Sequence, residues 1–425
     1  MAYIANGESG SSVRAKLNIM AQSGALKALS LAATRPVDVV MIGDSNQNKD
    51  STGFDHGLGK ALAARFPPYA SPIYSLSASG PSASQGYAGG GAPPGTGATT
   101  GAPSEHDDYQ LTHTTYQYNA ATAIGSTNGV IIFDQADGLD VNANLRAHIS
   151  YGTFDTGSGS FRPAHRRESA PFSPTASGTV VNTNTGVKGR ALATYDLAAA
   201  ARSYDLGFKV QLPGGTASVG PTNFFWMRIE NRDRLAGSSV HTLYGEGGVS
   251  LYDMAAAIQG YTDARLKNYM ADVTYLQRLR GFDPMLVVYI NSAPNDRNEA
   301  STPSLGPLAT GTPTGALAYV DNLRAIQKRM DAMWVALGYD LSSLTYLIVP
   351  SHPISDPDDA SYILYRTGVT RWAAGNPRVS MIDVSLLTTS AQMVTADDYY
   401  SGGDKIHLKQ TGYERISGLL VAQIA

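Results

Sequence analysis

Val37-Asp-Val-Val-Met-Ile42 is a short and almost continuous apolar run, and Gly43-Asp44-Ser45-Asn46 follows it directly. Such a run is typical of a parallel strand that is buried on both faces, and glycine followed by small polar residues indicates a turn. A helical pattern covers residues 54–66. A strand that leads through a turn into a helix predicts the first unit of a βαβ arrangement.

The chain returns to this rhythm after residue 248. Helical patterns cover residues 251–280, 316–337, 359–374 and 409–424, and strands are expected at 285–290, 344–349 and 379–384. Strands that alternate with helices of this length favour a parallel sheet with helices on both faces. We therefore predict a three-layer α/β/α domain.

The part between these two regions has a different texture. Short β-rich runs at residues 129–134, 147–154, 205–212 and 224–230 are separated by turns of Gly, Pro, Asn and Ser, as in an antiparallel sandwich. We predict that an antiparallel β-sandwich, residues 86–240, interrupts the α/β domain formed by residues 31–85 and 241–425. Residues 1–30, with a possible amphipathic helix from Ser11, form an N-terminal segment.

Composition excludes several classes of function. The formal net charge is −3 and no Lys/Arg block is present, so neither nucleic acid nor an anionic membrane is an expected partner. The absence of cysteine excludes disulfides and thiol nucleophiles. No signal peptide or membrane-spanning run is recognisable, the acidic stretches at 105–108 and 356–359 lack calcium-loop spacing, and no nucleotide fingerprint occurs. We therefore assign neither a metal nor a cofactor.

Two short motifs carry possible catalytic chemistry. Ser45 lies just after a predicted strand, where a turn exposes the side chain near a helix N-terminus, and Asp404-Lys-Ile-His407 places a carboxylate three residues before an imidazole. A serine nucleophile needs a base within hydrogen-bond reach and a group that orients this base. Asp404 and His407 can supply both, although each motif taken alone is equally consistent with a helix cap.

Four blocks occur together in the order found in SGNH (GDSL-type) hydrolases: Gly43-Asp44-Ser45, Gly247-Gly248-Val-Ser250, Asn295-Asp296 and Asp404-x-x-His407. The chain resembles this superfamily over residues 35–80 and 241–425. The resemblance implies a flavodoxin-like fold and no cofactor. It also implies a Ser45 nucleophile, an Asp404–His407 pair, and an oxyanion hole from the Ser45 N–H, the Gly248 N–H and the Asn295 side chain.

The chain departs from the family pattern in two places. The third block reads Ala293-Pro294-Asn295-Asp296, which leaves Asn291 as a competitor for the oxyanion role. More than 150 residues separate the first two blocks, so Gly247 is an alternative donor to Gly248. We expect Asp44, Asn46, Gly247, Asn291 and His352 to line the pocket, the last as a structural or substrate-shaping histidine.

A β-rich insertion beside an SGNH site resembles the arrangement of carbohydrate O-acetylesterases. This implies hydrolysis of O-acetyl or other short acyl esters on an acetylated cell-surface polysaccharide, through an acyl-enzyme. Two alternatives stay open: a non-catalytic glycan-binding receptor on the same scaffold, which fold alone does not exclude, and an enzyme of the lipase or thioesterase type.

The N-terminal residues 5–18 are similar to openings of bacteriophage tail-fibre and tailspike proteins. This similarity implies attachment to a virion, or homotrimer formation, through the N-terminal segment. A protein released by host lysis would act outside the cell without a signal peptide. The same sequence features also fit a cytoplasmic bacterial esterase.

Overall fold

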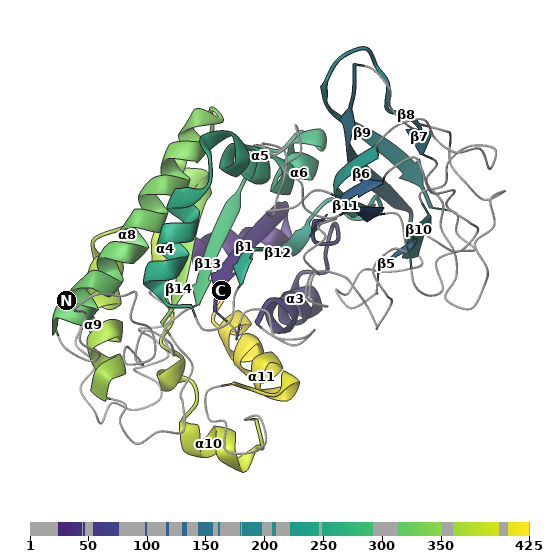
Figure 1. The fold of residues 1–425 in the computed structure, drawn as a ribbon. Coiled ribbons are helices and arrows are strands. Elements are labelled where there is room, and N and C mark those ends of the chain that lie inside the picture. The colour runs from purple at the N-terminus through teal and green to yellow at the C-terminus, as the bar shows by residue number, and fades with distance from the viewer. Residues whose placement is uncertain are drawn as a thin grey trace.

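The computed structural model describes residues 24–44, 46, 54–75, 98–99, 116–118, 130–133, 143–155, 160–161, 179, 181–197, 206–209, 222–245, 249–291, 313–350, 360–398 and 407–424. They form a parallel sheet covered by helices, with a separate antiparallel sheet beside it (Figure 1). The expected α/β class with a parallel sheet is confirmed. Most of the N-terminal segment lies outside the described residues.

Five strands make up the parallel sheet. Their order in space is β12 (Gly237–Gly245), β1 (Pro36–Gly43), β13 (Leu286–Asn291), β14 (Leu344–Val349) and β15 (Val379–Met381). Counted along the chain this order is 2-1-3-4-5, which is the flavodoxin-like arrangement. In such sheets the strand order reverses between the first and third strands, and ligands bind in the crevice at their carboxyl ends. The topology therefore predicts a ligand site at the carboxyl ends of β1 and β13.

Helices cover both faces of the sheet, and β1 contributes to the core on each side. All of its residues are buried. Val39 and Met41 pack with one helical layer, whereas Val40 and Ile42 pack with the other. The first layer consists of α2 (Gly24–Ser30), α3 (Phe54–Arg65) and α11 (Gln410–Val421), and the second of α4 (Leu251–Gly260), α5 (Asp263–Val273), α8 (Pro313–Ala336) and α9 (Ala360–Ala374). Burial on both faces is the physical reason for the continuous apolar run.

The helical pattern expected over residues 251–280 is divided into three helices. The Thr262 side chain accepts a hydrogen bond from the Arg265 N–H (3.2 Å), which caps a new helix after α4 ends. A third helix, α6 (Tyr275–Leu279), follows α5. The remaining short helices are η1 (Leu31–Ala33), η9 (Leu341–Ser343), η10 (Val384–Leu386) and α10 (Ser390–Thr395).

The antiparallel sheet is built from the chain between α3 and β12. Its strands follow the order β3 (Ala98–Thr99), β4 (Tyr116–Tyr118), β11 (Thr222–Asn231), β6 (Leu145–Thr153) and β9 (Gly189–Asp196), and β2 (Tyr74–Ser75) also pairs with β11. Two further pairs join β5 (Val130–Phe133) to β10 (Leu206–Lys209) and β7 (Ser160–Phe161) to β8 (Val181–Asn182). These pairings differ from the expected domain boundaries at two places. β2 lies before residue 86 but pairs in the antiparallel sheet, and β12 begins before residue 241 but belongs to the parallel sheet. That these strands form a two-layer sandwich stays a prediction.

The two faces of β6 differ in polarity. Ala147 and Ile149 are apolar, whereas the intervening His148 and Ser150 are polar, and all four are buried. His148 stands opposite Arg228 of β11 on the same face. This polar face meets the α/β domain, because the Arg228 guanidinium donates to the carbonyl of Val273 at the end of α5 (2.6 Å). Charged and polar groups thus contribute to the contact between the antiparallel sheet and the α/β domain, beside the apolar packing of Phe225 and Trp226.

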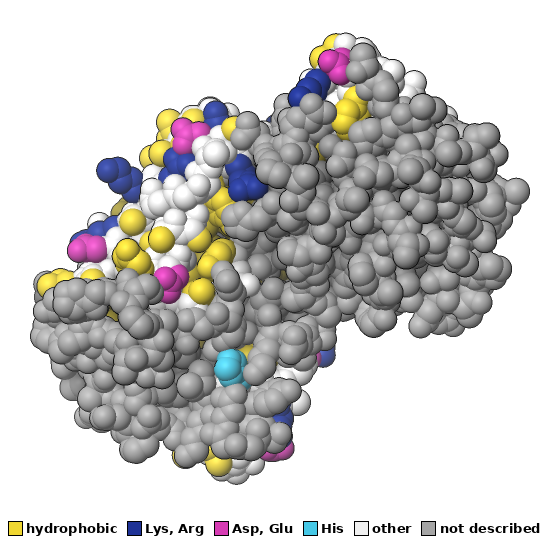
Figure 2. Space-filling view, viewed as in Figure 1, with side chains coloured by type: hydrophobic (Ala, Val, Ile, Leu, Met, Phe, Trp, Pro, Cys, Tyr) yellow, Lys and Arg dark blue, Asp and Glu magenta, His cyan; other side chains and the backbone are white. Residues whose placement is uncertain are grey.

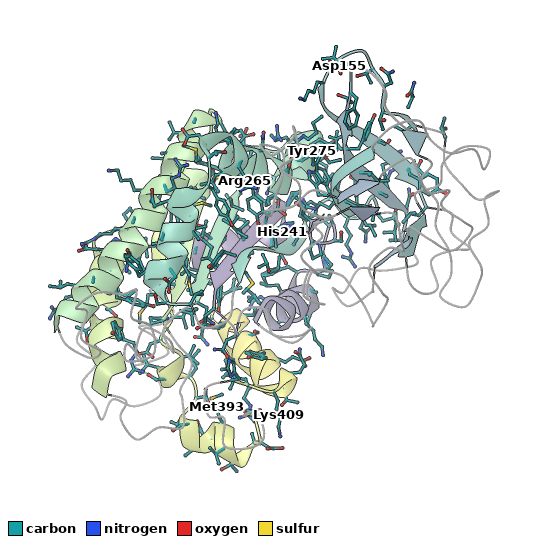
Figure 3. The ribbon with its side chains drawn as sticks, in the orientation of Figure 1. Asp155, His241, Arg265, Tyr275, Met393 and Lys409 are labelled. Atoms are coloured by element: carbon teal, nitrogen blue, oxygen red, sulfur yellow. The ribbon has the colours of Figure 1, made fainter. Side chains whose placement is uncertain are left out.

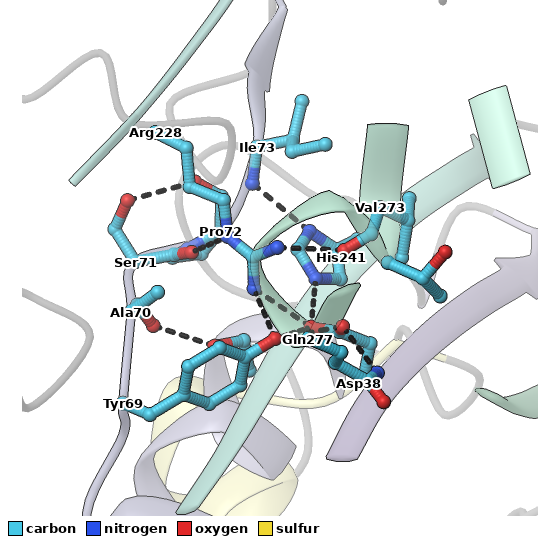
Figure 4. Close-up of polar contacts among 12 residues, drawn as sticks. Asp38, Tyr69, Ala70, Ser71, Pro72, Ile73, Arg228, His241, Val273 and Gln277 are labelled. Carbon is cyan, nitrogen blue, oxygen red and sulfur yellow. Dashed lines mark hydrogen bonds and ion pairs between the residues drawn. The ribbon is translucent and has the colours of Figure 1, made fainter. Parts of the chain in front are cut away.

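A buried polar network centred on Asp38 holds this contact together (Figure 4). Arg228 donates to Asp38 Oδ1 (2.7 Å), and Gln277 of α6 donates to Asp38 Oδ2 (2.7 Å). The Tyr69 hydroxyl bonds to the same carboxylate. Burial alone would raise the pKa of Asp38, but the Arg228 charge and the hydrogen bonds outweigh burial and lower it.

His241 joins the same network from β12, between the two sheets (Figure 3). Its Nδ1 accepts a hydrogen bond from the Ile73 N–H (2.9 Å). Its Nε2 is therefore the protonated nitrogen, and it donates a hydrogen bond to Asp38 Oδ1 (2.9 Å). Burial lowers the pKa of His241 and favours this neutral form. Ile73 lies where the chain passes from the α/β domain into the antiparallel sheet, and His241 lies on β12, the strand by which the chain returns. The same hydrogen-bond network therefore holds both connections between the two parts.

The outer surface over α4 and α8 carries mixed side chains. Hydrophobic, basic and acidic groups are interspersed on the described part of this face (Figure 2). Within the part of the chain that the structure describes, no helix has the length and apolar character that crossing a membrane requires.

Candidate active site

The carboxyl ends of four parallel strands form one row across the sheet. Gly43 of β1 is in register with Gly245 of β12 on one side and with Asn291 of β13 on the other, and Asn291 is in register with Val349 of β14. Three of the four predicted site blocks follow one of these strand ends within a few residues, whereas the Asp404–His407 block comes later in the chain, between α10 and α11. The first two blocks, far apart in sequence, thus follow neighbouring strands because the chain returns from the antiparallel sheet into β12.

Several predicted site residues lie outside the described residues: Ser45, Gly247, Gly248, Asn295, His352 and Asp404. Their roles therefore stay predictions. The structure does describe Asp44, Asn46, Asn291 and His407, and these four define the candidate site.

Asp44 and Asn46 flank Ser45 and are both buried. The Asn46 N–H donates to Asp44 Oδ1 (2.8 Å), an i to i+2 bond that closes a tight turn. Burial raises the pKa of Asp44 to about 6, although the hydrogen bond from Asn46 and the charge of His407 act to lower it. His407 lies near this turn, because Leu408, the residue after it, and Asn46 bond to the same Tyr413 hydroxyl.

Asn291 lies at the end of β13, beside β1 at the topological switch point. It is 2% exposed, and its Nδ2 makes no hydrogen bond of normal geometry to a described residue, although it lies close enough to the Tyr289 hydroxyl to oppose the rise that burial causes in the pKa of that group. A buried amide without a partner is costly unless another group binds it. Asn291 therefore remains a competitor to Asn295 for the role of oxyanion donor.

His407 lies just before α11 and is half-buried. Leu408, the next residue, donates its N–H to the Tyr413 hydroxyl (3.4 Å), and this hydroxyl donates to Asn46 Oδ1 (2.9 Å). On the other side of the segment, the Lys409 N–H donates to the Asp398 carbonyl (2.7 Å). Figure 3 shows Lys409 close to Met393 of α10. The segment that carries His407 is thus tied to the Ser45 turn and to the end of α10.

Two parts of this arrangement were not foreseen from the sequence. The first is the strand β12, whose sequence is Gly-Ser-Ser-Val-His-Thr-Leu-Tyr-Gly. Its serines and histidine interrupt the apolar run that is expected of a buried strand, so the sequence did not indicate it. Tyr413 falls within the helix expected over residues 409–424, and no role in the site was expected of it. Its place in an apolar helical stripe signals burial but not the partner of its hydroxyl.

Comparisons with known proteins find similarity in structure alone. No family model matches the chain, and no curated protein sequence matches it. A solved structure titled "Peptidoglycan O-acetylesterase in action, 5 min" is similar with a TM-score of 0.52 and 13% identity, covering 97% of this chain and 96% of that one. The likeness supports a shared fold over nearly the whole length, including the antiparallel region.

Two other solved structures are similar over smaller parts. A family two carbohydrate esterase from Clostridium thermocellum in complex with cellohexaose has a TM-score of 0.28 and 13% identity, with 66% of this chain and 90% of that one covered. A lipase from a goat rumen metagenome has a TM-score of 0.30 and 14% identity, with 45% and 81% covered.

Proposed function

We propose that this protein is a serine esterase that removes O-acetyl or other short acyl groups from a cell-surface polysaccharide. Ser45 is the nucleophile, His407 is the base, and Asp404 orients the base. The observation that carries the proposal is that the described flanks of Ser45 and the segment of His407 are joined at the switch point of a flavodoxin-like sheet. This is the place where open α/β sheets bind their ligands.

The proposed reaction passes through an acyl-enzyme. His407 takes the proton of the Ser45 hydroxyl as the oxygen attacks the ester carbonyl, and the tetrahedral oxyanion is held by the N–H groups of Ser45 and Gly248 and by the amide of Asn295 or Asn291. Collapse of this intermediate releases the sugar hydroxyl, which receives the proton from His407. Water, activated by the same base, then releases the acid.

Asp44 supports this chemistry electrostatically. Because its pKa is about 6, Asp44 is ionised at neutral pH. A negative charge near His407 favours the imidazolium that forms when the base takes the serine proton.

The substrate class is supported by two features. An antiparallel sheet stands beside the α/β domain and offers a surface on which a polymer can rest. The similar structure of TM-score 0.52 bears a title that names a peptidoglycan O-acetylesterase, and its likeness extends over both parts of this chain. Among acetylated glycans, O-acetylated peptidoglycan is therefore the first substrate to test.

The experiment measures acid release from 4-nitrophenyl acetate, 4-nitrophenyl palmitate, O-acetylated peptidoglycan and a second O-acetylated polysaccharide. The wild type is compared with Ser45→Ala. We expect acetate release by the wild type, highest with one of the glycans, and a loss of at least about 1000-fold in Ser45→Ala.

Ser342→Ala is the matched control, because Ser342 is exposed and lies in η9, before the opposite end of β14. It should retain wild-type rates. Preference for palmitate would support the lipase alternative instead. If the folded wild type binds glycan but cleaves no ester, the protein is a glycan-binding receptor and the proposal fails.

A further inference from the structure

We propose that Tyr413 is a positioning residue whose hydroxyl sets the distance between Ser45 and His407. The inference rests on the proposed esterase function and adds a residue to its machinery. Tyr413 itself does not touch the reacting atoms in this proposal. It acts by holding together the two segments that carry them.

The hydroxyl of Tyr413 lies between the two segments and bonds to each. It donates to Asn46 Oδ1 at 2.9 Å, one residue after Ser45, and it accepts from the Leu408 N–H at 3.4 Å, one residue after His407. Tyr413 and Leu408 are 0% exposed and Asn46 is 1% exposed. Water cannot readily replace these bonds in a site this buried, so their loss would leave polar groups without partners.

The bond from Asn46 to Asp44 extends this connection along the turn. The Asn46 N–H donates to Asp44 Oδ1 and the Asn46 side chain accepts from Tyr413, so both the backbone and the side chain of Asn46 are held by hydrogen bonds. Asn46 thereby transmits the position of Tyr413 to both flanks of Ser45.

Close packing of α11 against its neighbours holds Tyr413 in this position. A Cβ atom on Gly57 of α3 would lie 2.9 Å from the Tyr413 carbonyl oxygen and 2.9 Å from Ser417 Oγ. A Cβ atom on Gly412 would lie 2.7 Å from the Asp398 carbonyl oxygen. Because both glycines permit approaches that any larger residue would prevent, α11 is seated against α3 and against the end of α10 on either side of Tyr413.

The first test is Tyr413→Phe, which removes the hydroxyl and keeps the ring. We expect kcat for 4-nitrophenyl acetate to fall about 10- to 100-fold while KM changes less than about twofold, because displacing reacting groups by a fraction of an ångström affects the chemical step more than binding. Tyr346→Phe is the matched control. Tyr346 is also 0% exposed, and its hydroxyl donates to Asp331 Oδ1 (2.8 Å), a residue of α8.

The control should lose stability as Tyr413→Phe does but keep wild-type kcat. If both variants lose kcat equally at equal folded fraction, or if Tyr413→Phe keeps wild-type kcat, the positioning role is overturned. Gly57→Ala provides a second route to the same site, because it pushes α11 away without touching the hydroxyl. It should lower kcat with little change in KM, and an unchanged kcat in this folded variant also contradicts the proposal.

Amide hydrogen exchange at Leu408 separates this inference from the proposed function. We expect exchange at Leu408 to be at least about tenfold faster in Tyr413→Phe than in the wild type, and unchanged in Tyr346→Phe. If the wild type hydrolyses no ester, the esterase function fails and the catalytic role of Tyr413 fails with it. Unchanged Leu408 exchange in Tyr413→Phe overturns the structural tie even if the enzyme is active.

Discussion

Arg228 of β11 and Asp38 of β1 form an ion pair with an N–O distance of 2.7 Å, and both side chains are fully buried. The two residues belong to different sheets and stand 190 positions apart in the sequence. Buried ion pairs add little net stability, because desolvation offsets their attraction, but leaving one charge without its partner is costly. The pair therefore favours one seating of the antiparallel sheet on the α/β domain over others.

Replacing Arg228 with methionine should strongly destabilise the protein. Arg228→Met leaves the Asp38 carboxylate buried without a cation and also removes the donor to the Ser71 carbonyl (3.0 Å). We expect the free energy of unfolding to fall by about 3–5 kcal/mol. Urea unfolding followed by circular dichroism measures this change.

An exposed ion pair provides the comparison. Arg324 and Asp321 on α8 are 55% and 67% exposed, and Arg324→Met should cost less than about 0.5 kcal/mol. Arg228→Lys should lie between the two variants, because it keeps the charge but loses the planar set of donors. Equal effects of Arg228→Met and Arg324→Met would show that the buried pair has no special role.

Glu230 should make the stability depend on acid pH. Burial raises its pKa, but the hydrogen bond from His148 and the charge of Arg280 outweigh burial and lower the pKa to about 2. The ionised form is thus favoured in the folded state, so its contribution is present above pH 4.5 and is lost as the pH falls toward 2. A shift of this size corresponds to about 3 kcal/mol at neutral pH.

Glu230→Gln removes this dependence. We expect the variant to be less stable than the wild type at pH 7, and this difference to shrink by about 1 kcal/mol at pH 3.5, as measured by thermal unfolding at the two pH values. Destabilisation by the same amount at both pH values would contradict the assigned pKa. Asp263→Asn is a suitable control, because Asp263 is 68% exposed in its pair with Arg329 and such a pair contributes little.

Asp44 should have the opposite effect. Its pKa of about 6 in the folded protein exceeds the ordinary value of 3.8, so the folded state holds a proton that the unfolded state releases. Stability therefore falls as the pH rises from about 4 to about 6. Asp44→Asn should be stabilised relative to the wild type by about 2–3 kcal/mol more at pH 7.5 than at pH 4. Urea unfolding at the two pH values measures this, and a difference that is independent of pH would contradict it.

Gly237, where the chain enters β12, should tolerate no side chain. Its φ is +140°, and a Cβ atom there would overlap the Pro67 carbonyl oxygen. We expect Gly237→Ala to lower the free energy of unfolding by more than about 3 kcal/mol, since both backbone strain and a clash must be relieved. Gly418 in α11 meets nothing within 4 Å, so Gly418→Ala should be neutral or stabilising by up to about 1 kcal/mol. Differential scanning calorimetry of both variants tests this contrast.

Local patterns predicted the elements of the α/β domain well. The strand expected at 344–349 is β14 at Leu344–Val349, and the helix expected at 359–374 is α9 at Ala360–Ala374. These elements are buried on both faces or on one stripe, which leaves a clear trace in the order of apolar residues. Elements with weaker traces were missed or misread: β9 alternates between partly buried and exposed positions, and capping by Thr262 divides the long helical pattern.

The candidate site was predicted in its members but not in its connections. The order of the four blocks placed Ser45 and His407 in one site, and the structure brings their neighbours Asn46 and Leu408 onto a single tyrosine hydroxyl. The side chain of Tyr413 and that of Asn46 are 367 positions apart in the sequence. Nothing local in either motif indicates that the two meet.

By itself, the sequence determined the α/β class, the antiparallel character of the intervening strands and the positions of the motifs, because each depends on the spacing of residues within a few turns or strands. Only the tertiary structure decided that β12 pairs with β1, that Arg228 reaches Asp38, and that Tyr413 ties His407 to the Ser45 turn. These contacts join residues far apart in the chain, and their partners are chosen by packing geometry and by the need of buried polar groups for hydrogen bonds.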